Sequence, residues 1–307
     1  MEPVICSSEI MTSLRERLLE ELSPKLHNKD VLHLDVPIHL NVGDMLIDMG
    51  TDQLFLDAGV RSVERVSVLD QARFFHRVKK VSENAVLILH GGGNFGDLYP
   101  HHQEFRSRVV ARFPNNPILV FPQSVHFSSQ ALLKEQMLVY QQHSNLTFFA
   151  RDQYSFDLLS PFLNEGQLRI LPDLAHMLYG RFPMQESCDR PCMLFRRRDI
   201  EAVEKLNQEG FDWSDIVTSE LRSKFRSLKK QVKWQGRLKI DFGAHSRWRG
   251  YRDALVDAAI EEYGKYNIVD SDRLHGVILA HILGKPVVAR DNCYGKIRRY
   301  VETHFDF

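Results

Sequence analysis

The sequence has 307 residues, with 40 Lys and Arg against 40 Asp and Glu, and 43% of its residues are hydrophobic. A chain of this length can bury a sizeable core and can form two domains, and its balanced charge excludes a global field that would recruit nucleic acid. No apolar run approaches the roughly 20 residues that cross a bilayer. The first residues lack the basic and apolar regions of a secretory signal, so we expect a cytoplasmic protein.

The first 180 residues alternate predicted strands with predicted helices. Apolar runs rich in branched residues indicate buried strands, and apolar residues at helical spacing indicate amphipathic helices. The predicted strands cover residues 31–36, 65–69, 85–89, 117–121, 146–150 and 168–171. The predicted helices cover residues 7–22, 44–58, 101–113, 129–143 and 152–162. This alternation predicts an α/β fold with a doubly wound parallel sheet.

A second α/β unit follows a segment rich in glycine and proline, residues 179–191, which we interpret as a linker. We therefore expect two Rossmann-like domains, residues 1–180 and residues 191–307, with an active site in the cleft between them. The second unit has predicted strands at 192–195, 266–269 and 286–289, and predicted helices at 251–263, 277–283 and 295–304. The last helix is expected to pack back on the first domain. Residues 200–239 show no clear alternation.

Within that segment, residues 221–240 contain eight basic side chains and no acidic one. Arg222, Arg226 and Lys230 lie at helical spacing, which is typical of a basic amphipathic helix. Such a helix can lie on an anionic membrane surface, and it can equally be an ordinary solvated face. The sequence supports both interpretations, one of which is a peripheral contact with the inner face of the membrane.

The cysteines and paired histidines show no spacing typical of a metal site. Only Cys188 and Cys192 lie close together, and their spacing fits no paired zinc motif. His101 and His102 have no partner at metal-ligand spacing. We interpret the cysteines, which also include Cys6 and Cys293, as ordinary reduced thiols. We expect neither a metal nor a cofactor.

The most informative stretch is His90-Gly91-Gly92-Gly93-Asn94-Phe95-Gly96-Asp97, directly after the apolar run 85–89. Successive glycines let a ligand approach the backbone amides closely. The glycine spacing also fits a dinucleotide fingerprint, but Pro100 would interrupt the required helix and the next strand offers no carboxylate for a ribose. A purely structural turn is the other alternative. The polar groups His90, Asn94 and Asp97 favour a ligand site.

Polar residues follow several other predicted strands. Because the carboxyl ends of parallel strands share one edge of a sheet, we expect these residues to meet there. They are Asn41, Asp44, Gln123, Ser124, Arg151 and Asp173.

Arg273, Leu274 and His275 open a predicted helix in the second unit. A helix N-terminus favours an anion, a guanidinium matches a carboxylate or phosphate, and histidine transfers protons near neutral pH. A run of arginines, residues 196–198, follows another strand and adds positive charge. Together they predict an anion site. In the alternative, Arg273 pairs with Asp270 or Asp272, His275 only caps the helix, and the arginine run is solvated.

This ordered set of motifs resembles the polysaccharide pyruvyl transferases, particularly the bacterial exopolysaccharide enzymes. The motifs are Asn41-x-Gly43-Asp44, His90 to Asp97, Phe121-Pro122-Gln123-Ser124, Phe149-Ala150-Arg151-Asp152, Pro172-Asp173 and Arg273-Leu274-His275-Gly276. The resemblance covers roughly residues 36–304, and the basic stretch before Lys239 departs from it. It implies a glycosyltransferase-B-like pair of domains. It also implies transfer of an enolpyruvyl unit from phosphoenolpyruvate onto two hydroxyls of a sugar, which gives a pyruvate ketal and phosphate.

The resemblance further implies roles for single residues. His275 would be the general acid and base, and Asp97 would orient or deprotonate an acceptor hydroxyl. Arg273 and one of Arg196 and Arg197, with Arg197 preferred, would bind the donor. The other substrate-binding candidates are Leu274, Gly92, Gly93, Asn94, Asn41, Asp44, Gln123, Ser124, Arg151 and Asp173. The expected partners are phosphoenolpyruvate and a sugar or lipid-linked oligosaccharide acceptor, without nucleic acid. A nucleotide-sugar glycosyltransferase and a non-catalytic glycan-binding protein remain the alternatives.

Overall fold

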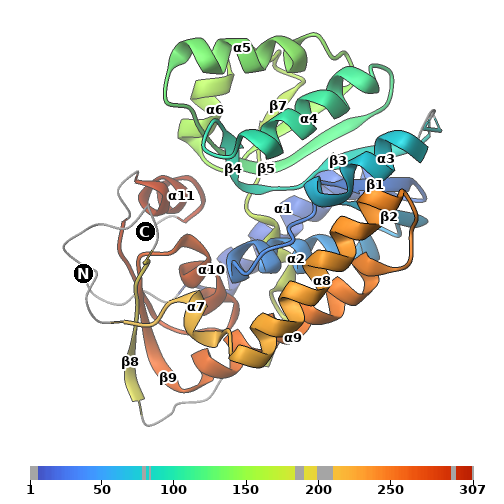
Figure 1. The fold of residues 1–307 in the computed structure, drawn as a ribbon. Coiled ribbons are helices and arrows are strands. Elements are labelled where there is room, and N and C mark those ends of the chain that lie inside the picture. Colours follow the sequence, from blue (N-terminus) through green and yellow to red (C-terminus); the bar gives the residue numbers. More distant parts are fainter. Residues whose placement is uncertain are drawn as a thin grey trace.

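The structure is a computed structural model that describes residues 6–77, 81–82, 84–183, 190–198, 210–291 and 295–305. This part of the chain forms two β-sheets in which all strand pairs are parallel (Figure 1). The larger sheet has the order β2-β1-β3-β5-β6-β7, with β4 paired to β5, and the smaller has the order β10-β9-β8. The predicted α/β class with parallel strands is confirmed.

The larger sheet contains β1 (Asp30–Leu34), β2 (Ser62–Val66), β3 (Val86–Leu89), β4 (Gly92–Gly96), β5 (Ile118–His126), β6 (Leu146–Ala150) and β7 (Leu168–Ile170). The smaller sheet contains β8 (Arg190–Phe195), β9 (Tyr266–Ser271) and β10 (Val287–Ala289). Short elements connect them: the 3-10 helices η1 (Val68–Asp70) and η2 (Leu174–Leu178), and the helix α3 (Gln71–Arg77).

Helices cover both faces of the larger sheet, and β3 shows why its sequence is apolar throughout. Side chains along a strand alternate between its faces, so Leu87 and Leu89 enter one core cluster while Val86 and Ile88 enter another. The first cluster includes α4 (Pro100–Arg112), α5 (Gln130–Gln141) and α6 (Gln153–Leu159). The second includes α1 (Ser8–Leu26) and α2 (Val42–Asp57). Figure 1 shows the two layers above and below the sheet.

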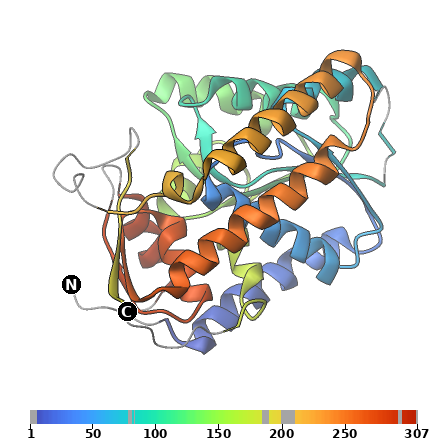
Figure 2. The same cartoon turned by 60° about the horizontal axis from the view of Figure 1, so that its bottom comes forward.

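A third core cluster joins the smaller sheet to the starts of α1 and α2. In it Met11 and Met45 belong with Trp248, Leu255 and Val277. The helices of this half are α7 (Trp213–Ile216), α8 (Ser219–Leu238), α9 (Ala244–Gly264), α10 (Leu274–Ile282) and α11 (Lys296–His304). The long helices α8 and α9 lie side by side on the outside (Figure 2). Because α1 and α2 pack on both the larger sheet and this core, the two sheets are held next to each other.

The glycine-rich stretch differs from the predicted turn. Residues Gly92–Gly96 form β4, because β5 continues beyond the predicted 117–121 and pairs with them. A β-carbon at Gly96, where φ is 146°, would lie 1.7 Å from the carbonyl oxygen of His126, so only glycine permits this pairing. Pro100 does not interrupt the next helix. It occupies the first position of α4, where a backbone N–H is not needed.

Residues 200–239 also contain more regular structure than the pattern predicted. In α8 the Thr218 side chain accepts a hydrogen bond from the backbone N of Leu221, while Leu228 and Val232 are buried. The basic amphipathic helix indicated by the spacing of Arg222, Arg226 and Lys230 is therefore present, as part of α8. Residues 184–189, 199–209 and 292–294 lie outside the described part, and with them part of the predicted linker, Cys188 and Cys293. Cys6 and Cys192 are free thiols.

Candidate active site

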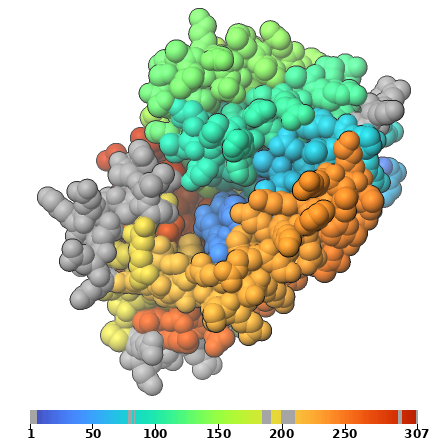
Figure 3. Space-filling model, viewed as in Figure 1, coloured from blue at the N-terminus to red at the C-terminus, as the bar shows by residue number. Residues whose placement is uncertain are grey.

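The ends of strands from both sheets open on one cavity of about 570 Å³. Figure 3 shows this hollow, with the start of α2 visible in blue at its floor. It brings together nine of the predicted site residues: Asn41, Asp44, Gly93, Asn94, Arg151, Arg197, Arg273, Leu274 and His275. These residues follow parallel strands, whose carboxyl ends share one edge of each sheet, and this arrangement explains the grouping.

His275 lies in the first turn of α10 and contacts a buried carboxylate. Its Nε2 is 3.2 Å from Oδ2 of Asp173, and Arg151 Nη1 donates to the same oxygen at 2.7 Å. Burial by itself would raise the pKa of Asp173, but His275 and Arg151 hold that pKa well below its usual range. An ionised carboxylate only accepts hydrogen bonds, so Nε2 carries the proton. Nδ1 is then the nitrogen that can exchange a proton with a ligand.

Asp173 is held from several sides and is itself 1% exposed. Its Oδ1 accepts a hydrogen bond from the backbone N of Ala175 at 2.9 Å, and its own backbone N donates to the Tyr300 hydroxyl at 2.9 Å. Tyr300 belongs to α11, which also packs against α6. Asp173 was predicted to bind substrate, but the structure places it behind His275, where it orients the imidazole.

Gly43 supplies the surface on which the His275 ring lies. A β-carbon at this position would be 2.5 Å from His275 Nδ1, so any larger residue would displace the ring. The Asn41 side chain caps α2 by accepting from Gly43 N at 3.1 Å, and its Nδ2 donates to Asp44 Oδ2 at 2.8 Å. The motif Asn41-x-Gly43-Asp44 thus provides both close packing against the imidazole and an oriented carboxylate in the cavity.

The cavity has more cationic side chains than carboxylates. Its lining includes Arg151, Arg197, Arg222, Arg273 and Lys296, against Asp44 and Asp212. Arg273 donates from Nε and Nη2 to the two oxygens of Asp212 at 2.6 and 2.8 Å. Asp212 is thus a partner of Arg273 that the sequence did not predict. In a chain without net charge, this local excess makes the cavity suitable for an anion.

Arg196 and Arg197 lie on different sides of the strand end. Arg196 is 7% exposed and its Nη2 is 2.8 Å from Oδ1 of Asp270, so it belongs to the interior of the smaller sheet. Arg197 lines the cavity, and its backbone N donates to Asp272 Oδ1 at 2.8 Å. Consecutive residues of an extended chain point to opposite sides, which separates the two arginines.

The structure does not bring Asp97 to the cavity. Its Oδ2 accepts hydrogen bonds from both the backbone N, at 2.9 Å, and the hydroxyl of Ser128, so it fixes the connection between β5 and α5. Gln123 and Ser124 are buried beneath the cavity lining. Gln123 donates to the His90 carbonyl oxygen at 2.6 Å, and Arg151 Nη2 donates to Ser124 Oγ at 3.0 Å.

Gly92 also lies outside the lining. Its φ of 129° favours glycine, and a β-carbon on it would be in ordinary contact with Asp44 Oδ1 at 3.4 Å. Asn94 lines the cavity, and its side-chain oxygen accepts from Arg106 at 2.6 Å.

Sequence reasoning missed about half of the lining. The additional residues are His39, Leu40, Tyr99, His102, Asp212, Trp213, Ser214, Val217, Arg222 and Lys296. Five of them lie within the segment 200–239 that showed no clear alternation. A local signal was present there, because Asp212 and Asp215 form a capping box at the start of α7.

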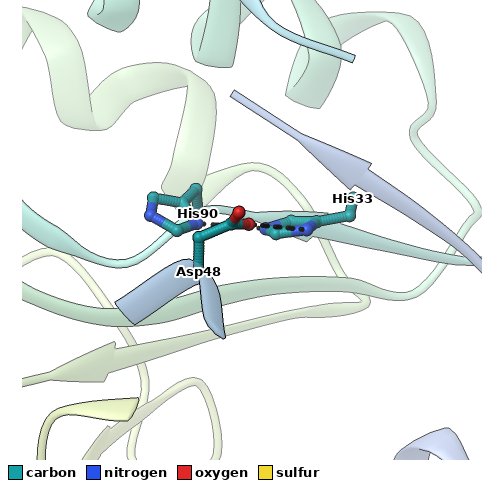
Figure 4. A group of neighbouring side chains, drawn as sticks. All are labelled: His33, Asp48 and His90. Carbon is teal, nitrogen blue, oxygen red and sulfur yellow. Dashed lines mark hydrogen bonds and ion pairs between the residues drawn. The ribbon is translucent and has the colours of Figure 1, made fainter. Parts of the chain in front are cut away.

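Three buried polar side chains from β1, α2 and the end of β3 lie together: His33, Asp48 and His90 (Figure 4). His33 Nε2 is 3.1 Å from His90 Nδ1, and His33 Nδ1 is 3.9 Å from Asp48 Oδ1. Two histidines and a carboxylate are a ligand set that a divalent metal can use. Here, however, the rings bond to each other and Asp48 accepts from Arg252 at 2.7 Å. Burial lowers the pKa of both histidines, so we interpret the group as a neutral histidine pair beside an ion pair.

Comparison with known proteins gives one consistent family. The profile of the family described as "Polysaccharide pyruvyl transferase" matches residues 41–294. "Putative pyruvyl transferase EpsO" of Bacillus subtilis is 31% identical over 303 residues, covering 97% of this chain and 92% of that protein. "Pyruvyl transferase 1" of Schizosaccharomyces pombe is 28% identical over 285 residues, covering 90% of this chain and 69% of that protein.

A solved structure of a functionally uncharacterised protein from Klebsiella pneumoniae shares the fold. It matches with a TM-score of 0.56 and 18% identity, over 94% of this chain and 93% of that one. At this identity the likeness concerns the fold alone.

Proposed function

We propose, from the premise that this chain belongs to the polysaccharide pyruvyl transferase family, that it transfers an enolpyruvyl unit from phosphoenolpyruvate to a sugar. The acceptor would be an exopolysaccharide or its lipid-linked precursor, and two of its hydroxyls would form a pyruvate ketal. The observation that carries this proposal is the oriented His275 in a cavity with excess cationic side chains. It combines a proton-transferring group with a binding site for a multiply charged anion.

The donor requires two cationic contacts, because phosphoenolpyruvate carries a carboxylate and a phosphate. Arg197 and Arg273 follow the neighbouring strands β8 and β9, and both line the cavity. Asp212 holds the guanidinium of Arg273 in one orientation before any ligand binds, which lowers the ordering cost of binding. Lys296 and Arg222 provide further positive charge at the same cavity.

The reaction needs a balanced set of proton transfers. A proton is added to the methylene carbon of the donor, and one sugar hydroxyl adds to the neighbouring carbon. Phosphate then leaves, and the second hydroxyl adds to complete the ketal. The two sugar hydroxyls release two protons. One replaces the proton that was added to the methylene carbon, and the other leaves with phosphate. We assign these transfers to Nδ1 of His275, since Asp173 engages the other nitrogen.

The acceptor hydroxyl needs a hydrogen-bond acceptor in the cavity, and we assign this role to Asp44 in place of Asp97. The Asp44 carboxylate accepts from Asn41 at 2.8 Å and lies 3.5 Å from His39 Nε2. Its Oδ1 lies next to Gly92 of β4, at 3.4 Å from the position of a β-carbon there. Asp97 is already bound to Ser128.

The test is incubation with phosphoenolpyruvate and galactose- or mannose-terminated acceptors, followed by phosphate measurement and mass spectrometry of the acceptor. We expect phosphate release and acceptor gain of one carboxyethylidene group. His275→Gln should lower the rate by about 100-fold or more, in line with the usual contribution of general acid and base catalysis.

His76→Gln is the matched control, because His76 is exposed on α3 and lies outside the cavity lining. It should leave the rate unchanged. Absence of phosphate release with every acceptor, together with thermal stabilisation by a nucleoside diphosphate but not by phosphoenolpyruvate, would refute the proposed reaction.

A further inference from the structure

The C-terminal end of α8 and the turn that follows expose an unusual group of large apolar side chains. Trp234, Leu238, Ile240 and Phe242 are 43%, 52%, 58% and 37% exposed. They are four of the eleven exposed large apolar residues in the described part of the chain, and they fall within nine consecutive positions. We call them, together with the basic residues Lys230, Lys233, Arg237, Lys239 and Arg247, the α8 tip.

The apolar side chains of the α8 tip are held in place by buried backbone contacts. The side-chain oxygen of Gln235 accepts from the backbone N of Phe242 and of Ala244, both at 3.2 Å. Gly236 packs directly on Asp70, where a β-carbon would be 2.7 Å from the Asp70 Cα. The turn is thus fixed to the rest of the molecule, and the exposed apolar groups are part of a preformed surface.

The charges around this surface are mostly positive, and the one carboxylate within positions 234–242, Asp241, lies 3.6 Å from Arg73 Nη1. Residues 221–240 contain eight basic side chains and no acidic one, although the whole chain has no net charge. The guanidinium of Arg237 lies 5.5 Å from the Trp234 ring, and that of Arg247 lies 5.9 Å from the Phe242 ring. Aromatic and aliphatic groups surrounded by lysine and arginine are typical of surfaces that lie at the boundary between lipid headgroups and acyl chains.

We propose that the α8 tip binds the surface of an anionic lipid bilayer, with Trp234, Leu238, Ile240 and Phe242 inserted between the headgroups. The basic residues around them contact the lipid phosphates. No helix in the described ranges is long and apolar enough to span a bilayer, so this contact is peripheral. A symmetric pair of two copies is a poorer occupant, because it would place like charges opposite each other.

A second cavity lies between the candidate active site and the middle of α8. It has a volume of about 450 Å³ and is lined by Lys229 of α8 and the exposed side chains Leu98 and Tyr99. It shares His39, Tyr99 and His102 with the first cavity, and Arg222 of α8 lines that first cavity. Helix α8 therefore extends from the active site to the proposed lipid surface (Figure 1). This arrangement suits an acceptor that is anchored in a membrane, while bilayer binding itself does not depend on the proposed reaction.

The full chain offers a spectroscopic test, because Trp213 and Trp248 are buried and Trp234 is the exposed tryptophan. The protein is mixed with phosphatidylcholine vesicles that contain or lack phosphatidylglycerol, and binding is measured by sedimentation. We expect binding to the anionic vesicles, a blue shift of tryptophan emission, and quenching by brominated acyl chains. Trp234→Phe should keep the binding and lose the blue shift and the quenching.

Two variants distinguish binding through the α8 tip from non-specific adsorption of the protein to vesicles. Replacing Lys233, Arg237 and Lys239 by glutamine should weaken vesicle binding by roughly tenfold or more, since each basic residue near the surface contributes severalfold. The matched control carries Lys134→Gln and Leu138→Gln on α5, which are exposed on another face, and should bind as the original protein does.

Absence of binding to anionic vesicles at low salt would overturn the proposal. So would binding without any change in Trp234 emission, because it would show adsorption without insertion. The surface would belong to another partner if the original protein did not bind vesicles but formed a dimer, or bound a random oligonucleotide, and the triple-glutamine variant lost that property.

Discussion

At the scale of single residues, the geometry of His275 depends on a glycine more than 200 positions away in the sequence. Gly43 allows the imidazole to lie directly against α2, while Asp173 engages Nε2 from the other side. The ring is therefore confined between a carboxylate and a backbone surface, which favours one orientation of Nδ1. This explains why a motif in the first sheet and a motif in the second both contribute to one proton-transferring group.

We predict that Gly43→Ala lowers the turnover number by about 100-fold, because the added methyl group would displace the His275 ring. The NMR signals of the His275 ring should shift in the variant, and the Michaelis constant for phosphoenolpyruvate should change less than the turnover number. Steady-state kinetics and ring spectra measure both effects. A variant with full activity would show that the ring position does not matter.

The matched control is Gly250→Ala in α9, where an added β-carbon would meet nothing within 4 Å. Activity should be unchanged, and the free energy of unfolding should rise by about 0.5 to 1 kcal/mol, because alanine has the higher helix propensity.

At the scale of secondary-structure elements, one buried carboxylate fixes α8 and α9 to the larger sheet. Asp70 at the end of η1 accepts from Arg73 Nε at 3.1 Å and from Gln235 at 3.3 Å, and it lies 3.1 Å from His245. Arg73 is fully buried. Asp70 therefore links η1 and α3 to α8 and α9, and it also positions Gln235 at the α8 tip.

We predict that Asp70→Asn lowers the free energy of unfolding by about 3 kcal/mol, because the buried Arg73 would lose its buried counter-charge and keep only Glu64 and Asp241, which are 39% and 47% exposed. Urea denaturation of the variant and of the original protein measures the difference. Asp30→Asn is the control, since Asp30 and its partner Arg61 are exposed, and it should have a much smaller effect. Equal effects of the two substitutions would contradict the importance of the buried pair.

At the scale of the whole molecule, several histidines are buried so deeply that desolvation outweighs any nearby carboxylate that would favour the protonated form. Burial lowers the pKa of His281 and of His304 to about 4, and that of His176 to about 3. In the unfolded chain these groups have ordinary pKa values near 6.5. Between pH 6.5 and 4 the unfolded state therefore binds more protons than the folded state.

We predict that stability is fully present above pH 6.5 and decreases as the pH falls toward 4, by about 1.4 kcal/mol per pH unit for each such histidine. Urea denaturation at a series of pH values measures the slope. His281→Leu removes one buried imidazole whose pKa is lowered by burial alone. The unfolding free energy of this variant should therefore change less steeply with pH, by the contribution of one histidine. A stability that does not change between pH 7 and 5 would disprove this expectation.

The sequence by itself determined the class of fold, the family and most polar motifs of the cavity. Each of these leaves a local pattern in the sequence. A strand covered on both faces must be apolar, and motifs such as Asn41-x-Gly43-Asp44 and Arg273-x-His275 can be recognised without knowing which residues they contact.

Only the tertiary structure decided which side chains meet, because these contacts join residues far apart in the chain. It separated Arg197 from Arg196, bound Asp97 to Ser128, and formed β4 through the extension of β5. It also placed Asp212 on Arg273 and left the α8 tip exposed. Burial and pairing are properties of the folded surface, and no local pattern in the sequence specifies them.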